Sequence, residues 1–228
     1  MCPYLRSSFM DLLQWFFDFL LHIDQHLAEL LARYGTALIL IVALIIFCET
    51  GLVVTPILPG DSMLFAFGAL AAQATSGLSV HVSVAAFIAA AFIGNQVNYS
   101  VGRYIGPKVY EKNYKLIKRE YLERTRRFFE KYGALTIVYT RFAPILRTFA
   151  PFVAGVGQMP LGRFTFYNFV GGVAWVTSFT YGGYFFGNIP FVKEHFKWIV
   201  LLIIIVSLLP AIYAFVKVRL ARRSAPHT

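Results

Sequence analysis

The fold is decided by residues 133–160, GALTIVYTRFAPILRTFAPFVAGVGQMP, an apolar stretch that cannot form one straight membrane-spanning helix. Pro144 and Pro151 interrupt a helix there, because proline lacks the backbone N–H and its ring clashes with the preceding turn. Broken backbone is tolerated inside a bilayer only where it packs in protein or lines a cavity. We therefore predict that this stretch is a re-entrant hairpin, which enters and leaves the membrane on the same side.

The composition of the whole chain indicates an integral membrane protein. Of its 228 residues, 58% are hydrophobic and 14% are charged, and the mean hydropathy is +0.63. Soluble domains carry about 25% charged residues, so a cytosolic enzyme and a disordered chain are both disfavoured. The length is typical of a single domain.

The formal net charge of +10 is concentrated beside apolar segments. Residues 103–131 contain ten basic and four acidic residues, and a further basic group, Lys217, Arg219, Arg222 and Arg223, lies near the C-terminus. Basic clusters of this kind are typical of cytoplasmic loops that contact anionic headgroups. We therefore expect a cytoplasmic segment 107–131, a cytoplasmic tail 218–228 and no nucleic-acid partner.

The number of membrane crossings follows from these two basic regions. Crossing the hydrocarbon core takes about 20 helical residues, and residues 162–187 and 191–217 are each long and apolar enough. Because 107–131 and the tail lie on the same side, the crossings between them must be even in number. Residues 133–160 therefore do not cross, which agrees with the broken backbone predicted for them.

The first half of the chain resembles the second. Residues 34–73 form an apolar stretch that is broken around Pro56, Pro59 and Gly60, and residues 82–106 make a further span. The tripeptide Pro-Ile-Leu at 56–58 recurs at 144–146, and the glycine spacing of 102–106 recurs at 183–187. Two matched units that enter from opposite sides are typical of secondary transporters.

The predicted fold is therefore an all-α polytopic membrane protein. It contains two inverted repeats, each a re-entrant hairpin followed by a crossing helix, within a membrane domain of residues 34–217. Residues 1–33 form an N-terminal extension, in which residues 9–33 place apolar and acidic side chains at helical spacing. Such a pattern favours an amphipathic helix at the membrane surface.

Four charged residues, Glu49, Asp61, Arg141 and Arg147, interrupt the apolar regions. One isolated charge at mid-membrane costs about 2.5–3.5 kcal/mol on insertion scales, so we predict that the hairpin tips meet and the acids face the arginines. Structural roles are the alternative: Asp61 as a helix cap, Arg147 as a donor to carbonyls freed by the helix break, or Glu49 and Arg141 as a fixed ion pair.

The same residues suggest a chemistry. Arginine binds phosphate through two parallel hydrogen bonds and stays protonated, so Arg141 and Arg147 are candidate phosphate ligands. A carboxyl whose arginine partner is taken by a phosphate can bind a proton, which makes Glu49 and Asp61 candidates for proton coupling and charge balance. The candidates for lining the cavity or breaking the hairpins are Pro56, Pro59, Gly60, Asn95, Asn98, Tyr99 and Pro144.

Enzymatic roles lack the necessary residues in this sequence. There is no His-Glu-x-x-His metal motif and no Gly-x-Ser-x-Gly nucleophile turn. Two cysteines form neither a disulfide framework nor a metal set. We expect no catalytic residue, no metal and no cofactor. The tryptophans, Trp175 among them, are expected at the membrane interfaces.

Three motifs resemble the DedA family of bacterial inner-membrane proteins, which is also called the VTT-domain or SNARE-associated superfamily, and within it the DedA subgroup. The motifs are Glu49-x₆-Pro56-x-x-Pro59-Gly60-Asp61, Gly94-Asn95-x-x-Asn98-Tyr99-x-x-Gly102-Arg103, and Arg141-Phe142-x-Pro144-x-x-Arg147-Thr148. The resemblance implies inverted re-entrant hairpins and a bacterial inner-membrane location. It also implies that the two acids and the two arginines are essential. Many relatives carry Asp where this chain has Asn95, so a proton-coupling role at that position is not expected here.

The leading prediction is a translocase of undecaprenyl phosphate, a polyprenyl phosphate, linked to the proton motive force. Membrane lipids and protons would be its partners, and a homo-oligomer is compatible with it. The alternatives are a proton-coupled cation or drug antiporter, a phospholipid scramblase, and an assembly factor in which the charges only fix the fold.

Overall fold

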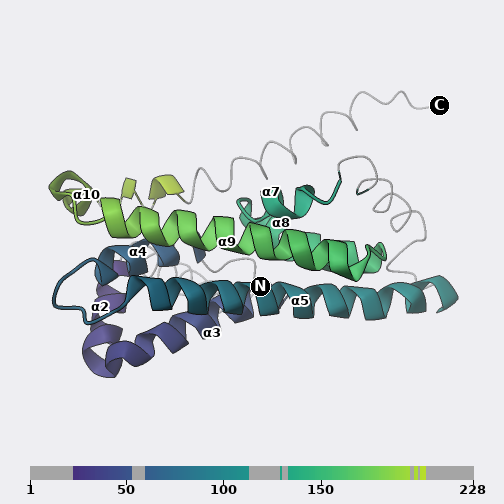
Figure 1. Cartoon of the computed structure of the whole chain (residues 1–228), viewed down its shortest axis with the longest axis horizontal. Coiled ribbons are helices and arrows are strands. Elements are labelled where there is room, and N and C mark those ends of the chain that lie inside the picture. The colour runs from purple at the N-terminus through teal and green to yellow at the C-terminus, as the bar shows by residue number, and fades with distance from the viewer. Residues whose placement is uncertain are drawn as a thin grey trace, which may run out of the picture.

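The computed structural model describes residues 23–52, 60–112, 129, 133–195, 198–199 and 201–203, and this part of the chain is helical (Figure 1). The all-α prediction is confirmed for it. The helices in chain order are α2 (Ile23–Tyr34), the 3-10 helix η1 (Gly35–Ala37), α3 (Leu38–Gly51), α4 (Gly60–Ala71), α5 (Val80–Lys112), α7 (Thr136–Thr140), α8 (Pro144–Val156), α9 (Leu161–Phe186) and α10 (Pro190–Glu194).

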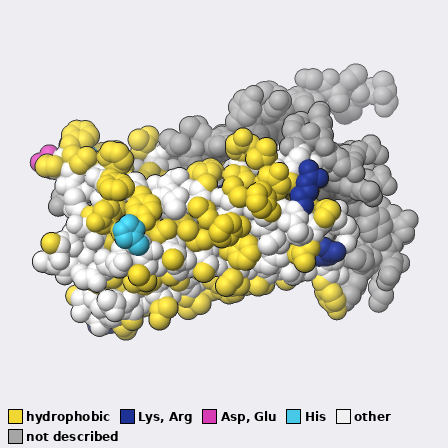
Figure 2. Space-filling model, in the orientation of Figure 1, with side chains coloured by type: hydrophobic (Ala, Val, Ile, Leu, Met, Phe, Trp, Pro, Cys, Tyr) yellow, Lys and Arg dark blue, Asp and Glu magenta, His cyan; other side chains and the backbone are white. Residues whose placement is uncertain are grey.

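Two stretches of the described chain, Gln25–Gly51 and Val80–Gly106, are long and apolar enough to cross a membrane. Shorter apolar helices cover Gly60–Ala71 and Leu146–Val156. Helix α9 has 26 residues but is less apolar, because Gly, Tyr, Thr and Ser interrupt its hydrophobic residues. Figure 2 shows hydrophobic side chains across the visible face of the molecule, and exposed examples include Leu40 and Phe166. The chain is a membrane protein.

Several predicted segments lie outside the described residues. They are residues 1–22, the break at 53–59 with Pro56 and Pro59, most of the basic segment 107–131, and the chain beyond residue 203, which includes the tail 218–228. Helix α5 continues six residues beyond the predicted end at 106, into the basic segment, and ends at Lys112.

The first hairpin is formed by α3 and α4. Helix α3 ends at Gly51, and Leu52 is extended with φ −98° and ψ 117°, so the chain leaves the helix before the predicted proline-containing break. Helix α4 begins at Gly60. The N-terminal helix α2 buries Ile23 and Leu27, while Gln25 and Glu29 are exposed. The described part of the amphipathic segment therefore buries apolar side chains within the protein, where it packs on α4.

The second hairpin is formed by α7 and α8, and its break lies at residues 141–143. Pro144 is the first residue of α8, where its missing N–H would have no partner in the helix anyway. Pro151 lies inside α8, which continues to Val156. The prediction that Pro151 breaks the helix is therefore wrong: in a buried helix, tertiary packing can compensate for one lost backbone hydrogen bond.

The second helix of each hairpin packs mainly on the long helix of the other half of the chain. Helix α4 packs mainly on α9, whereas α8 packs mainly on α5, and α5 and α9 run side by side (Figure 1). Helix α3 packs on α5 and α7 packs on α9. Each long helix thus contacts one arm of its own half and one arm of the other half.

Glycines make these exchanged contacts possible at close range. A Cβ atom on Gly183 would lie 1.9 Å from the carbonyl oxygen of Phe65, and one on Gly102 would lie 2.2 Å from the carbonyl oxygen of Phe152. Likewise, Gly68 faces the backbone of Thr180 and Gly155 faces the backbone of Tyr99. Small residues of this kind let helix backbones approach closely in membranes.

The two sets of contacts correspond residue by residue. In the long helices, Gly183 follows Gly102 by 81 residues, which is the predicted offset. In the second arms the contacting residues, Phe65 and Phe152, are 87 residues apart. The offset of 88 given by the Pro-Ile-Leu match is therefore one residue out of register with the packing.

Candidate functional site

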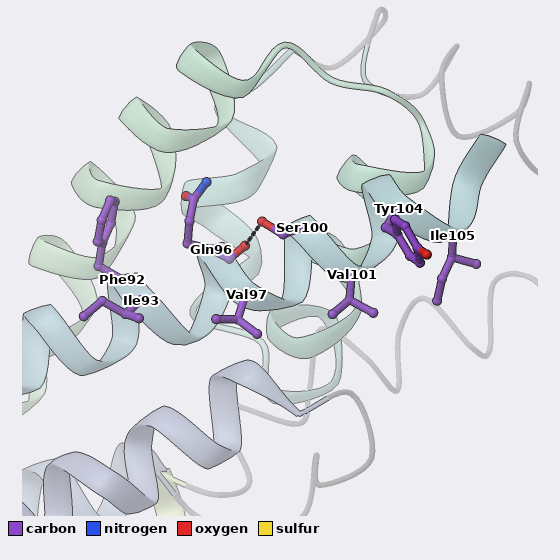
Figure 3. A pocket seen from close by; sticks show the side chains of 8 residues that line it. All are labelled: Phe92, Ile93, Gln96, Val97, Ser100, Val101, Tyr104 and Ile105. Carbon is purple, nitrogen blue, oxygen red and sulfur yellow. Dashed lines mark hydrogen bonds between the residues drawn. The ribbon is translucent and has the colours of Figure 1, made fainter. Parts of the chain in front are cut away.

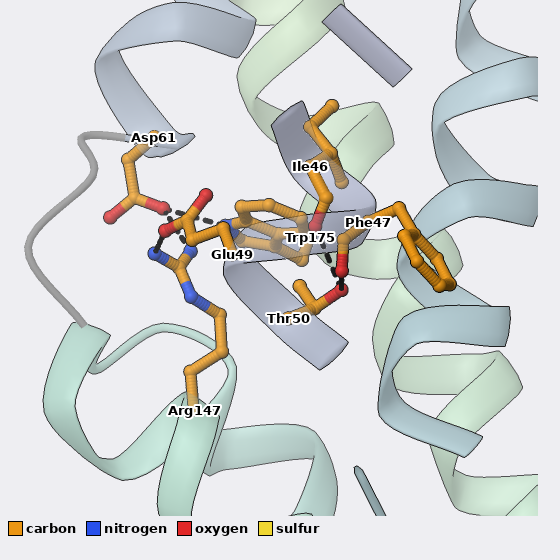
Figure 4. Close-up of polar contacts among 7 residues, drawn as sticks. All are labelled: Ile46, Phe47, Glu49, Thr50, Asp61, Arg147 and Trp175. Carbon is orange, nitrogen blue, oxygen red and sulfur yellow. Dashed lines mark hydrogen bonds and ion pairs between the residues drawn. The ribbon is translucent and has the colours of Figure 1, made fainter. Parts of the chain in front are cut away.

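Three of the four predicted charges meet in one buried cluster, which we call the carboxylate–arginine cluster: Glu49, Asp61 and Arg147 (Figure 4). Arg147 Nη1 donates to Asp61 Oδ1 at 2.7 Å, and Arg147 Nη2 donates to Glu49 Oε1 at 2.5 Å. All three residues are at most 4% exposed. One guanidinium thus bridges two carboxylates that come from the two arms of the first hairpin.

The helix breaks put these side chains at helix ends. Glu49 lies in the last turn of α3, Asp61 in the first turn of α4 and Arg147 in the first turn of α8. The helix dipole favours an acid at an N-terminus and a base at a C-terminus. Asp61 satisfies this preference, but Glu49 and Arg147 lie at the unfavourable ends, and their mutual ion pair compensates for it.

Trp175 of α9 completes the cluster. Its side chain is fully buried, its Nε1–H donates to Asp61 Oδ1 at 2.7 Å, and the Arg147 Cζ atom lies 4.5 Å from the centre of its ring (Figure 4). An arginine at this distance over an indole face gains a cation–π attraction. The expectation that Trp175 marks a membrane interface is therefore wrong.

Arg141 lies in a separate polar network with neutral partners. Its Nη2 donates to Asn168 Oδ1 at 2.5 Å and to the Ala91 carbonyl oxygen at 3.4 Å. Among the described residues it forms no ion pair, and its Nε and Nη1 have no hydrogen-bond partner, although the side chain is 1% exposed. The predicted contact between the acids and the arginines is thus made by Arg147 and not by Arg141.

Glycines of α9 make room for the Arg141 side chain. Cβ atoms on Gly171 and Gly172 would lie 3.1 Å and 3.4 Å from its Cδ and Nη1 atoms. The guanidinium therefore packs directly against the backbone of α9. Asn168, one helical turn earlier, also donates to the Phe92 carbonyl oxygen at 3.1 Å and so joins α9 to α5.

The three polar residues predicted on α5 have different roles. With its amide turned to satisfy both ends, Asn95 donates to the Thr50 carbonyl oxygen and accepts from Arg141 Nη2 at 2.9 Å. Asn98 donates to the carbonyl oxygens of Thr50 and Thr148, at 3.2 Å and 2.8 Å, and so links α3 to α8.

Tyr99 lies apart from both arginine networks. Its hydroxyl donates to the Met159 carbonyl oxygen at 2.5 Å and accepts from Arg103 at 2.8 Å, and its ring stacks on Phe164. Tyr99 therefore joins α5 to the start of α9 through hydrogen bonding and ring stacking, and it is not part of either arginine network.

The hairpin-break residues are only partly described. Gly60 lies against Glu49, since a Cβ atom there would be 2.3 Å from Glu49 Oε2. Pro144 begins α8, while Pro56 and Pro59 lie outside the described residues.

Two residues of the site, Trp175 and Asn168, were not predicted as functional. Asn168 could have been singled out as the one amide or charged side chain between Arg163 and Asn188 in a helix that buries it completely. Within the described ranges, no group of three or more His, Cys, Asp or Glu residues could hold a metal ion.

An apolar groove of about 620 Å³ runs along the outer side of α5 (Figure 3). Only Gln96 and Ser100 are polar among its lining residues, which are Phe92, Ile93, Gln96, Val97, Ser100, Val101, Tyr104 and Ile105. Its first residue, Phe92, accepts a hydrogen bond from Asn168, the partner of Arg141. Phe92, at one end of the groove, is therefore linked to the Arg141 network through its hydrogen bond with Asn168.

Comparisons with known proteins agree with the membrane fold. The VTT domain family matches residues 58–185, a range that contains Asp61 and both arginines. Protein DedA of Escherichia coli K12 is 51% identical over 218 residues, which is 95% of this chain and all of the relative.

More distant relatives cover most of the chain. An uncharacterized membrane protein of Mycobacterium tuberculosis H37Rv is 42% identical over 86% of each chain. Inner membrane protein YghB of E. coli K12 is 36% identical over 66% of this chain and 68% of its own. No solved structure matches the chain significantly.

Proposed function

The chain belongs to the DedA family of VTT-domain membrane proteins, and on that premise we propose that it translocates a polyprenyl phosphate across the membrane. The proposed substrate is undecaprenyl phosphate, and the proposed driving force is the proton motive force. The proposed location is the bacterial inner membrane, with the C-terminus in the cytoplasm. The name of one relative, an inner membrane protein, supports this location.

The proposed topology is a pair of inverted repeats, α3–α4–α5 and α7–α8–α9. It is supported by the exchange of second arms between α5 and α9 and by the equivalent glycine contacts at Gly102 and Gly183. Substrate sites in transporters of this architecture lie between broken helices near the membrane midplane. Both arginine networks are at such breaks.

The observation that carries the proposal is the state of Arg141. It is a buried guanidinium with neutral partners and with two N–H groups, on Nε and Nη1, that have no partner among the described residues. A buried charge without a counter-ion is costly, and guanidinium N–H groups form charge-assisted hydrogen bonds to phosphate oxygens. Arg141 is therefore the proposed first ligand of the lipid phosphate.

Arg147 is the proposed second ligand, and its engagement couples phosphate to protons. A phosphate that binds Arg147 competes with Glu49 and Asp61, which hold the guanidinium in the empty protein. A buried carboxylate that loses this partner is strongly destabilised, and binding a proton removes its charge. Phosphate and proton would therefore bind together and leave together.

The groove on α5 provides a place for the lipid chain. Its apolar lining suits an isoprenoid tail, and its Phe92 end adjoins the Arg141 network through Asn168. The tail would thus remain in an apolar environment while the headgroup reaches the buried arginine.

The test uses purified protein in liposomes and measures translocation of a fluorescent polyprenyl phosphate. We expect Arg141→Gln to lower the rate at least about tenfold, in line with the loss of a charge-assisted hydrogen bond worth about 1.5–3 kcal/mol. The matched control is Arg163→Gln, an arginine on the exposed first turn of α9, which should keep the wild-type rate. Wild-type rates in Arg141→Gln would refute the proposal.

A cation or drug antiporter is the second candidate, and the net charge of the carboxylate–arginine cluster favours it. Two carboxylates share one arginine, so the cluster carries one net negative charge when both acids are ionised. An antiporter would release protons when a cationic drug is added to proteoliposomes, and Arg141→Gln would leave this release intact. A scramblase, in contrast, would move neutral phospholipids at the same rate in Arg141→Gln and in the control Arg163→Gln.

A further inference from the structure

The two carboxyl groups of the carboxylate–arginine cluster are held very differently. Asp61 Oδ1 accepts two hydrogen bonds of 2.7 Å, one from Arg147 Nη1 and one from Trp175 Nε1. Glu49 Oε1 accepts one, from Arg147 Nη2, and Glu49 Oε2 has no hydrogen-bond partner among the described residues. Arg147 is therefore the one side-chain donor to Glu49 among the described residues, with the Gly60 backbone beside its Oε2, whereas Asp61 has a second side-chain donor on another helix.

Trp175 is fixed independently of Arg147. It is fully buried on α9 and belongs to the hydrophobic core that α3, α4 and α5 share with this helix. Its Nε1–H can only donate, so it stabilises the ionised form of Asp61. If Arg147 turns away, this donor stays in place and Asp61 keeps a side-chain hydrogen bond, while Glu49 is left without a side-chain donor among the described residues.

Among the residues that the structure describes, the surroundings of Glu49 contain no other cation that could replace Arg147. The charged groups facing it are Asp61 of α4 and Arg147 of α8. The buried polar side chains described on α5 and α9, such as Asn95, Asn98 and Trp175, are neutral. Glu49 Oε2 lies instead against the Gly60 backbone.

We propose that Trp175 is a positioning residue that gives the two acids different roles: Glu49 binds the proton when Arg147 is engaged elsewhere, and Asp61 stays ionised. This inference rests on the proposed function for the event that draws Arg147 away, namely phosphate binding. The proton comes from water and returns to water when Arg147 pairs with Glu49 again.

The test is an infrared pH titration of the purified protein in liposomes without substrate. Wild-type minus variant spectra isolate the absorption of one protonated carboxyl group at a time. On acidification, we expect the first buried protonated carboxyl to be missing in Glu49→Gln and present in Asp61→Asn. The reverse pattern would overturn the inference.

Trp175→Phe tests the role of the indole N–H while keeping an aromatic ring under Arg147. Loss of this hydrogen bond should shift the carboxylate stretching band of Asp61, which the wild-type minus Asp61→Asn spectrum isolates. Trp198→Phe is the matched control, because Trp198 is 69% exposed. An unchanged Asp61 band in Trp175→Phe would overturn the inference, and it does so even if Glu49→Gln fails to fold.

These titrations separate the inference from the proposed function, because no sample contains a lipid phosphate. A correct order of protonation together with normal lipid transport in Arg141→Gln would refute the phosphate role and leave the two acids assigned. A reversed order of protonation together with lost transport in Arg141→Gln would support the phosphate role and overturn the assignment of the two acids.

Discussion

The two halves of the molecule pack alike but hold their charges differently. In both halves a glycine of the long helix, Gly102 or Gly183, touches the backbone of the other half's second arm. The first hairpin, however, contributes two acids and the second contributes two arginines. Within the described residues, Arg147 alone meets the acids, and Arg141 is left among neutral partners.

The different pairing of the charges in the two halves indicates which contacts hold the structure and which residues are available for function. Equivalent glycine contacts give the two hairpins the same scaffold, so packing does not require the charges to be unequal. A scaffold that needed only charge neutrality could have paired both arginines with both acids. Instead Arg147 is held by two ion pairs and leaves only its Nε without a partner, whereas Arg141 has no ion pair and leaves Nε and Nη1 without partners among the described residues. An uncompensated guanidinium with free donors is the arrangement expected of a binding residue.

The largest expected effect is the difference in the free energy of unfolding between a variant of Arg147 and a variant of Arg141. Arg147→Gln leaves two buried carboxylates without a counter-ion, so we expect the free energy of unfolding to fall by about 3–5 kcal/mol. Arg141→Gln removes a buried charge that has no carboxylate partner, so stability should stay within about 1 kcal/mol of wild type or rise. Equilibrium unfolding in mixed detergent and SDS micelles measures both, and equal losses would show that the two sites are alike.

A smaller effect tests the shared scaffold. Gly102→Ala and Gly183→Ala each push a Cβ atom into a backbone carbonyl of the other half, so each should lower the free energy of unfolding by about 1–3 kcal/mol. Gly162→Ala is the control, because a Cβ atom at that position would have no neighbour within 4 Å. A large loss in one variant and none in the other would refute equivalent packing.

The smallest effect compares two equivalent positions of the long helices, Tyr99 and Thr180, which are 81 residues apart. The Tyr99 hydroxyl bonds to the Met159 carbonyl, whereas Thr180 Oγ1 is buried without a partner among the described residues. Tyr99→Phe should therefore cost about 0.5–1.5 kcal/mol.

Thr180→Val is the companion change, and it should be neutral or slightly stabilising, because it removes an unsatisfied buried hydroxyl. Thermal unfolding in detergent would detect the contrast. Destabilisation by Thr180→Val would reveal a hydroxyl contact at this position.

Much of this architecture could be predicted from the sequence, because it depends on local signals. Helix breaks follow from Pro144 and from the proline-rich segment before Gly60, and close helix packing follows from the spacing of Gly102 and Gly183. The meeting of Arg147 with Glu49 and Asp61 could be predicted from charge balance, because isolated charges are costly in a membrane.

The remaining features depend on three-dimensional packing. Nothing in the sequence distinguishes Arg141 from Arg147, and their different partners are set by how α7 and α8 dock on α5 and α9. Trp175 resembles an interface residue by type, and only the packing of α9 against α4 brings its N–H to Asp61. Pro151 resembles a helix breaker, yet it lies inside α8.

A structure of the protein in lipid nanodiscs with undecaprenyl phosphate would decide whether Arg141 is a substrate ligand. We expect density for the phosphate at the Arg141 guanidinium, with the chain directed toward the groove on α5. Phosphate density confined to exposed arginines such as Arg103 and Arg163, with Arg141 still among neutral partners only, would mean that the buried guanidinium has no part in binding the lipid.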